Sequence, residues 1–277
     1  MGKIVAVTSG KGGVGKTTVC ANLGSALAQK GKRVMLLDAD IGLRNLDLLL
    51  GLENRIVFDV VDVVEKKCRN YKQALIRDKK FEKLFLLPAS QTRNKDAIKP
   101  QQMKELCDEL RQDFDYVLVD SPAGIEEGFK NAVISADEAI IVTNPEIAAV
   151  RDADRVIGLL ESADRKIIPH LIINRLRPNL VKKGMMLSVA DVQDILGITL
   201  LGIVPDDQRI LAASNRGMPA ILDRFSMAGR AFLAMAQHLL EERGELEVTG
   251  SNNSNGGIKG YLKRFLQGLL SHLEGGK

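Results

Sequence analysis

Tryptophan is absent from this sequence, and aromatic residues as a whole make up only 4% of it. A surface that stacks the bases of single-stranded nucleic acid uses aromatic side chains, so their scarcity argues against one here. Long apolar runs are also missing, since none approaches the ~18 residues that a membrane-spanning helix needs. With 45% apolar residues in 277, the chain can still bury a large core of leucine, isoleucine, valine and alanine.

Cysteine is scarce too. Cys20, Cys68 and Cys107 are widely spaced, odd in number and without metal-ligand spacing, which argues against a disulfide framework. This usage indicates a reducing compartment. Met1 runs directly into an apolar strand, so we expect no signal or transit peptide and a cytoplasmic location, with a plastid stroma also fitting.

The net charge is only +4, and most of it lies at the end of the chain. Residues 258–277 carry a net +3, so the rest of the chain is nearly balanced at +1. We therefore expect no specific nucleic-acid partner.

Short apolar runs alternate with helical patterns up to residue 243. The strand-like runs are Ile4–Thr8, Val34–Leu37, Leu84–Leu87, Tyr116–Val119, Ala139–Val142, His170–Ile173 and Leu201–Val204. The helical patterns are Lys16–Lys30, Lys99–Arg111, Ala149–Ser162, Val189–Leu196 and Phe225–Glu242. This alternation predicts an α/β domain over residues 1–243, with a mostly parallel twisted sheet and helices on both faces.

Composition changes after residue 243. Residues 244–257 are rich in glycine, serine and asparagine and predict a flexible linker, and residues 274–277 form a polar tail. Between them, residues 258–273 carry one apolar stripe at helical spacing with lysine and arginine beside it. Such a helix would be roughly 24 Å long, too short to span a bilayer upright.

This terminal pattern predicts an amphipathic helix that lies on an anionic membrane surface. The alternative is a helix that folds back on its own domain or docks in the groove of a partner. The residues that we expect at the membrane are Ile258, Tyr261, Leu262, Lys263, Arg264, Phe265, Leu266, Leu269 and Leu270.

A glycine-rich loop follows the first predicted strand and opens the first predicted helix. It matches the pattern G-x-x-x-x-G-K-[ST] of a P-loop, so we predict a P-loop NTPase fold that binds ATP and Mg²⁺. The glycines let backbone N–H groups surround a phosphate, Lys16 can reach the outer phosphates, and the Thr17 hydroxyl can ligate Mg²⁺. The expected nucleotide contacts in the loop are Gly10, Lys11, Gly12, Gly13, Val14, Gly15, Lys16, Thr17 and Thr18.

Acidic residues end two of the predicted strands. Asp38 and Asp40 follow the second strand, and Asp120 follows Tyr116–Val119. Ligands of parallel sheets bind beyond the carboxyl ends of the strands, so both groups can face the phosphates. We expect Thr17, Asp38 and Asp120 at the metal and Asp40 beside the attacking water.

Lys11 is unusual, because Lys16 already supplies the loop with a cation. A lysine at the start of the loop could be a solvated side chain, or it could point outward to a phosphate held by a partner subunit. We therefore count Lys11, Lys16, Asp40 and Asp120 as the candidate catalytic residues.

These residues resemble the deviant Walker A ATPases of the ParA/MinD family, whose signature lysine falls on Lys11. The resemblance extends over residues 2–243 and the terminal helix. It is carried by Lys11–Thr18, Asp40–Asp47, Leu87–Arg93, Asp120–Glu126 and Thr143–Glu146.

The resemblance implies a homodimer that forms around two Mg·ATP, with Lys11 crossing to the partner's phosphates. It places Asp40 in switch I, Asp120 in switch II, and Asn174, Pro205 and Asp206 near the adenine. It further implies an ATPase that binds the cytoplasmic face of the inner membrane in its ATP form. There it would recruit a MinC-like division inhibitor, respond to a MinE-like activator and position the division site.

Three other functions share the phosphate loop. A ParA-like partition ATPase would bind DNA through a basic surface and has no use for the terminal stripe. A reductase that resembles the nitrogenase iron protein would need cysteines bridging a cluster between subunits. A small-molecule kinase would need a substrate pocket where we expect the dimer interface.

Overall fold

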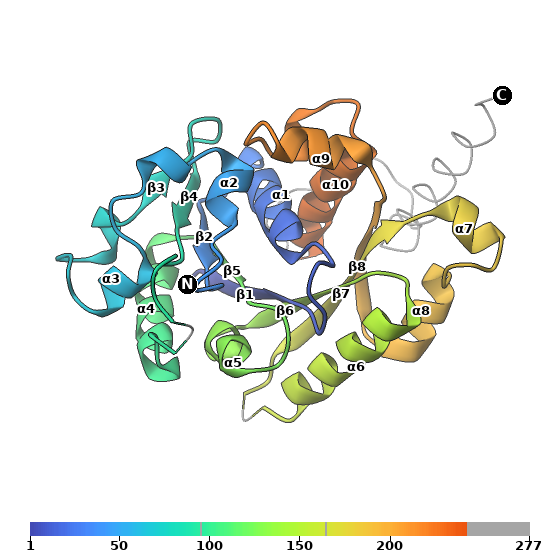
Figure 1. Cartoon of the computed structure of the whole chain (residues 1–277), viewed down its shortest axis with the longest axis horizontal. Helices are drawn as coiled ribbons and strands as arrows, with labels where there is room; N and C mark the ends of the chain where they lie inside the picture. Colours follow the sequence, from blue (N-terminus) through green and yellow to red (C-terminus); the bar gives the residue numbers. More distant parts are fainter. Residues whose placement is uncertain (95, 164, 243–277) are drawn as a thin grey trace.

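The computed structural model describes residues 1–94, 96–163 and 165–242. Within these ranges the chain forms one eight-stranded sheet in the order β3-β4-β2-β5-β1-β6-β7-β8 (Figure 1). Every pairing is parallel except that of β3 with β4. The strands are β1 (Lys3–Thr8), β2 (Val34–Asp38), β3 (Ile76–Arg77), β4 (Leu84–Leu87), β5 (Tyr116–Asp120), β6 (Glu138–Thr143), β7 (Ile168–Leu176) and β8 (Thr199–Pro205).

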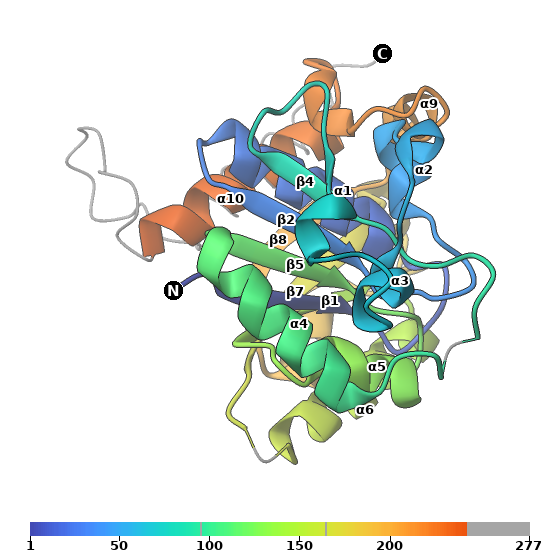
Figure 2. The same cartoon turned by 90° about the vertical axis from the view of Figure 1, so that its left-hand side faces the viewer.

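Helices cover both faces of this sheet (Figures 1 and 2). Helix α1 (Lys16–Gln29) packs with α2 (Leu46–Leu50) and α10 (Met227–Glu242), and α9 (Gln208–Ser214) contacts α2. The remaining helices are α3 (Val60–Val64), α4 (Pro100–Asp113), α5 (Glu127–Val133), α6 (Ile147–Glu161), α7 (Pro178–Lys182) and α8 (Val189–Leu196). Short 3-10 turns occupy Glu53–Arg55, Tyr71–Gln73 and Ala220–Leu222.

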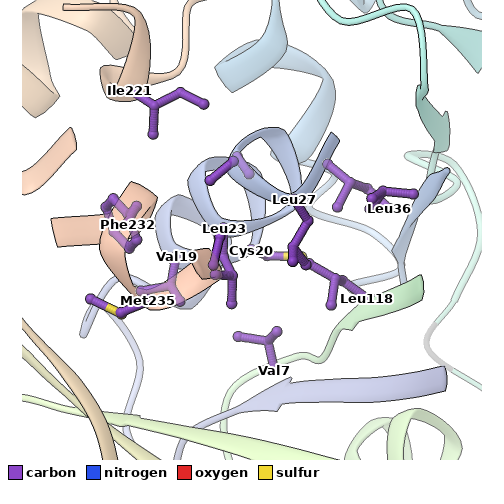
Figure 3. Close-up of a cluster of buried hydrophobic side chains, with 14 of the residues drawn as sticks. Val7, Val19, Cys20, Leu23, Leu27, Leu36, Leu118, Ile221, Phe232 and Met235 are labelled. Carbon is purple, nitrogen blue, oxygen red and sulfur yellow. The ribbon is translucent and has the colours of Figure 1, made fainter. Parts of the chain in front are cut away.

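Alternation along the central strands divides the core between the two faces. Val5 and Val7 of β1 join the cluster around α1 and α10, whereas Ile4 packs with α4 on the opposite face. Figure 3 shows Leu23 and Leu27 of α1 among side chains from β2, β5 and α10. Because the central strands are buried on both faces, each reads as a continuous apolar run.

The predicted α/β fold is confirmed, and each of the seven apolar runs lies in a parallel strand. The α1 helix ends as expected: Gly31 follows it with φ +89°, the left-handed conformation that glycine adopts without strain. The structure adds what the patterns did not predict, including the two-residue antiparallel edge strand β3 and the short helices α2, α3, α5, α7 and α9.

The predicted linker 244–257, the amphipathic helix 258–273 and the tail 274–277 lie outside the described residues. No helix in the ranges that the structure describes combines the length and apolar character needed to cross a bilayer.

Phe232 is the side chain through which the packing of α10 is most directly tested. It is fully buried in the cluster that joins α10 to α1. We expect Phe232→Ala to lower the free energy of unfolding by about 3–5 kcal/mol, because it removes buried surface and leaves a cavity. Urea denaturation measures this loss.

Phe225→Ala is the matched control, since Phe225 is 58% exposed. It should cost about 1 kcal/mol or less, mostly from its contacts with Arg209 and Arg224. Equal losses in the two variants would contradict the packing described here.

Candidate functional site

The phosphate loop connects β1 to α1 and depends on two left-handed glycines. Gly13 has φ +76° and Gly15 has φ +99°, and Gly15 caps the start of α1. The Ser9 hydroxyl donates to the Lys11 carbonyl at 2.8 Å and fixes the entry to the loop. A glycine-rich loop with this backbone, ahead of a helix N-terminus, can direct successive N–H groups at one anion.

Asn174, on β7, holds the loop from the side. Its Nδ2 donates to the Val14 carbonyl at 2.7 Å, and both side chains are buried. A Cβ atom at Gly15 would lie 2.4 Å from the same Nδ2, so the contact also requires glycine there. We predicted Asn174 beside the adenine. The structure shows its side chain bonded to the loop, a contact between residues 160 positions apart that local sequence does not signal, and the adenine contact stays a prediction.

Lys16, the first residue of α1, is a buried cation beside acidic strand ends. Only 8% of it is exposed, and burial lowers the pKa of its ammonium while the nearby Asp120 and Asp40 raise it. Asp120 ends β5 and accepts a hydrogen bond from the Thr17 side chain. The predicted grouping of Lys16, Thr17, Asp40 and Asp120 is therefore present in the fold.

Asp38 and Asp120 are direct neighbours across the β2–β5 ladder. Each is 1% exposed. Burial raises the pKa of Asp38 to about 7, against the hydrogen bonds that it accepts and with a contribution from Asp40. Burial also raises the pKa of Asp120 well above its ordinary value, and Asp38 raises it further. Ionising both of these buried, adjacent carboxyl groups costs free energy unless a cation binds beside them.

Asp38 also shapes the segment that follows β2. Its Oδ1 accepts from Asp40 N at 3.0 Å, and its Oδ2 accepts from Asn45 N at 3.2 Å and from Leu46 N at 3.3 Å. Asp38 thus holds the loop that carries Asp40 and the start of α2. This backbone role accompanies the metal role that we predicted for it.

Sequence reasoning missed a second support of the same segment. Arg44 has φ +34°, and its Nε lies 2.9 Å from Oδ2 of the fully buried Asp47. Gly42 N also donates to the Ser90 carbonyl at 2.8 Å. Arg44 lies before α2 with a left-handed backbone, so helical i,i+3 spacing does not predict its contact with Asp47.

Lys11 differs from Lys16 in its solvent exposure and in its ion-pair partner. Its side chain is 45% exposed, and its Nζ lies 3.6 Å from Glu146 Oε2, which is 54% exposed. Gly124 N donates to Ser9 O at 3.2 Å, so the segment after Asp120 borders the same rim. Ile125 and Ile147 on this rim are 45% and 60% exposed. The first lysine of the loop therefore faces outward among exposed apolar side chains.

The predicted adenine contacts Pro205 and Asp206 lie at the end of β8. Asp206 Oδ2 lies 2.5 Å from Arg177 Nε, an ion pair that joins β8 to the residue before α7. The neighbouring Asp207 caps α9 and accepts from the Ser226 hydroxyl at 2.8 Å. Asp207 thus has a structural role in this turn, and adenine contacts at Pro205 and Asp206 stay a prediction.

The residues present fit one Mg²⁺ bound together with a nucleotide. Asp120 Oδ1 is buried without a hydrogen-bond partner among the described residues, beside the Thr17 side chain. The described ranges contain no group of three or more histidine, cysteine or acidic side chains arranged to hold a metal by themselves. Mg²⁺ is commonly held in this way, by one or two protein oxygens together with phosphates and water.

Together, a glycine-rich loop on a helix N-terminus, a buried lysine and two acidic strand ends define an ATPase of the P-loop class. The model of the CobQ/CobB/MinD/ParA nucleotide-binding domain matches residues 5–220. The chain is 52% identical to the septum site-determining protein MinD of Bacillus subtilis over 266 residues, 96% of this chain and 98% of that protein.

Two solved structures are close in shape. The MinC:MinD cell division complex of Aquifex aeolicus contains a chain with a TM-score of 0.80 and 49% identity, over 86% of this chain and 96% of that one. MinD of Pyrococcus horikoshii, solved with Mg-ADP, has a TM-score of 0.80 and 31% identity, over 90% of this chain and all of that one.

The chain therefore belongs to the MinD septum site-determining ATPases of the CobQ/CobB/MinD/ParA family. Its cysteines agree with this assignment and not with an iron–sulfur reductase. Cys20, Cys68 and Cys107 are buried free thiols, whereas a cluster shared between subunits needs cysteines at the surface.

The raised pKa of Asp38 makes the stability of the ligand-free protein depend on pH. The folded state binds this proton up to about pH 7, whereas an unfolded aspartate loses it near its ordinary value of 3.8. The free energy of unfolding should therefore fall as pH rises through this window, by at most about 1.4 kcal/mol per pH unit from this carboxyl.

Urea denaturation at several pH values between 4 and 8 measures this slope. In the Asp38→Asn variant the slope should become shallower, because the titrating group is gone. An identical slope in the two proteins would show that Asp38 keeps an ordinary pKa.

Asn174→Ala should weaken nucleotide binding roughly tenfold or more, since it leaves the buried Val14 carbonyl unpaired. If Asn174 acts through the loop, as its hydrogen bond indicates, the variant should lose affinity for ATP and GTP by the same factor. Calorimetric titration with both nucleotides distinguishes the two roles. A loss confined to ATP would assign Asn174 to the adenine alone.

Proposed function

We propose that this chain is a switch in which bound ATP controls dimerisation, and dimerisation controls residence on an anionic membrane. The observation that carries this proposal is the exposed Lys11 at the rim of a phosphate loop that already contains the buried Lys16. Lys11 Nζ lies 3.6 Å from Glu146 Oε2, outside the phosphate loop of its own chain. It is well placed to reach a phosphate in a second copy.

Nucleotide binding rests on the loop and the acidic strand ends. Loop N–H groups and Lys16 would bind the phosphates, and Thr17, Asp38 and Asp120 would hold Mg²⁺, which neutralises charge on the β- and γ-phosphates. Asp40 lies close enough to Lys16 and Asp120 to influence the pKa of each. This proximity supports a role for its carboxylate in orienting a water against the terminal phosphate.

Hydrolysis would require the second subunit. Charge builds up on the transferred phosphoryl group, and a cation supplied from a partner is worth about 10³- to 10⁵-fold in rate for other P-loop enzymes. Among the described residues, the Lys11 side chain is held by an exposed ion pair with Glu146, which contributes at most about 1 kcal/mol. Releasing it to a partner's phosphate therefore costs little.

Dimerisation would then control membrane residence through residues 258–273. A single short amphipathic helix binds lipid weakly, but in a dimer the second insertion becomes intramolecular and avidity rises by about 10²- to 10⁴-fold. Hydrolysis would return monomers to the cytoplasm. The output of the ATPase cycle is the location of the protein.

The membrane-bound dimer would carry a division inhibitor. The Aquifex aeolicus relative, 49% identical, was solved in a MinC:MinD complex, which supports a MinC-like partner for this chain. A MinE-like activator that triggers hydrolysis completes the cycle. In this way the protein would determine where division is inhibited.

Sedimentation with anionic vesicles tests the proposal. The full-length chain should pellet in Mg·ATP and stay largely in solution in Mg·ADP, and a chain that ends at residue 257 should stay in solution in both. Lys11→Ala should lose ATP-dependent pelleting and slow hydrolysis by about 10³-fold or more.

Lys104→Ala is the matched control. Lys104 is 46% exposed and ion-paired at 2.9 Å to Asp108, so it resembles Lys11 in exposure and pairing but lies on α4. It should behave as the unmodified chain does. Equal pelleting in ATP and ADP would mean that the tail anchors the protein irrespective of nucleotide. ATP-dependent retention on DNA instead of vesicles would favour the ParA-like alternative.

A further inference from the structure

The amino edge of the sheet, opposite the phosphate loop, carries a cluster of cations on two adjacent loops. Lys30, Lys32 and Arg33 lie between α1 and β2, and Lys83 lies just before β4. We call these four residues the amino-edge patch. We propose that it is a second membrane contact, which binds the headgroups of anionic lipids while the terminal helix is inserted.

Three of these cations, Lys30, Lys83 and Arg33, contact groups without charge. Lys30 Nζ donates to the Gln237 side chain at 2.6 Å, and Lys83 Nζ donates to the Gly31 carbonyl at 2.8 Å. Arg33 lies over the rings of Phe114 and Phe85, at 5.0 and 5.4 Å from their centroids. Amide, carbonyl and ring partners orient a cation without cancelling its charge, so these contacts build a positive surface.

Three carboxylates near the patch have partners other than Lys30 and Lys83. Glu82 Oε2 lies 3.7 Å from Arg77, and the Asp115 carboxylate accepts from the backbone N of Arg33 at 2.7 Å. Glu241 accepts from Gln237 at 2.6 Å. Their charges reduce the field of the patch, but they do not pair with Lys30 or Lys83 in the described structure.

The position of the patch relative to the end of α10 points to lipid. Lys30 is bonded to Gln237, which lies in the penultimate turn of α10, and this helix ends at Glu242. Figure 2 shows the end of α10 on the same side of the molecule as the N-terminus. The described part of the chain therefore ends, with α10, on the side of the molecule that carries the patch. A flexible linker of the length predicted for residues 244–257 spans only roughly 20 Å on average, so an inserted tail keeps the patch near the bilayer.

This inference rests on the proposed recruitment to membranes and adds a second surface to it. The field of an anionic leaflet decays within a Debye length of about 8 Å, so the patch contributes only if it approaches that closely. Nucleotide binding is not affected, because the phosphate loop lies at the carboxyl ends of the strands. The patch and the catalytic residues can therefore be varied separately.

The test compares two double variants of the full-length chain, each of which removes two lysines. K30Q/K83Q removes two of the four cations of the patch, and K182Q/K183Q is the control, since Lys182 and Lys183 are exposed on and just after α7. Binding in Mg·ATP is measured on phosphatidylcholine vesicles with 20% or 60% phosphatidylglycerol. Hydrolysis without vesicles should be unchanged in both variants, which shows that they are folded.

K30Q/K83Q should bind the anionic vesicles about tenfold more weakly than the control, because each cation near such a surface contributes up to about fivefold. The difference should shrink at 20% phosphatidylglycerol. Equal affinity of the two variants, with membrane binding itself intact, would overturn the patch and leave the proposed function standing.

Two other results would also overturn it. Failure of the unmodified chain to bind vesicles would remove the proposed recruitment and the patch together. Loss of DNA retention in K30Q/K83Q, with vesicle binding unchanged, would reassign this surface to nucleic acid.

Discussion

The pairing of Asp38 with Asp120 across two neighbouring strands is the constraint on which the rest of the site depends. The sheet buries both carboxyl groups, and burial opposes the ionisation of each. Lys16 is buried next to them and loses part of its own proton affinity to burial. Such a site is electrostatically incomplete, and Mg²⁺ with a polyphosphate supplies the charges that complete it.

The same acidic pair connects the nucleotide site to the segment before α2 and to the rim that carries Lys11. Asp38 holds the backbone at Asn45 and Leu46, so the start of α2 and the segment with Asp40 depend on its charge state. Asp120 precedes the segment that borders the rim with Lys11. Changes at the phosphates can thus reach the surface where a second copy would bind. In the proposed cycle, that surface decides whether one or two terminal helices meet the membrane.

Much of the fold could be predicted from the sequence, because each parallel strand is buried on both faces and reads as an apolar run. The phosphate loop was also predictable, since Gly13 and Gly15 supply backbone conformations that other residues resist. Strand β3 could not be predicted, because two residues are too few to show the alternation of apolar and polar side chains that marks a strand. The hydrogen bond from Asn174 to Val14 could not be predicted either, because tertiary structure alone brings these residues together. Likewise, the backbone role of Asp38 depends on where α2 begins.

Proton release on nucleotide binding tests the central claim most directly. Mg·ADP is titrated into the protein at pH 6 in buffers of different ionisation enthalpy, with Asp38→Asn as the reference. Because the pKa of Asp38 is raised to about 7, the unmodified protein should release about one proton more than the variant, and this excess should fade as pH rises through 7. No difference in proton release between the two proteins at pH 6 would show that the Asp38 carboxyl is already ionised before Mg·ADP binds. That result would contradict the claim that the acidic pair needs a bound cation to ionise.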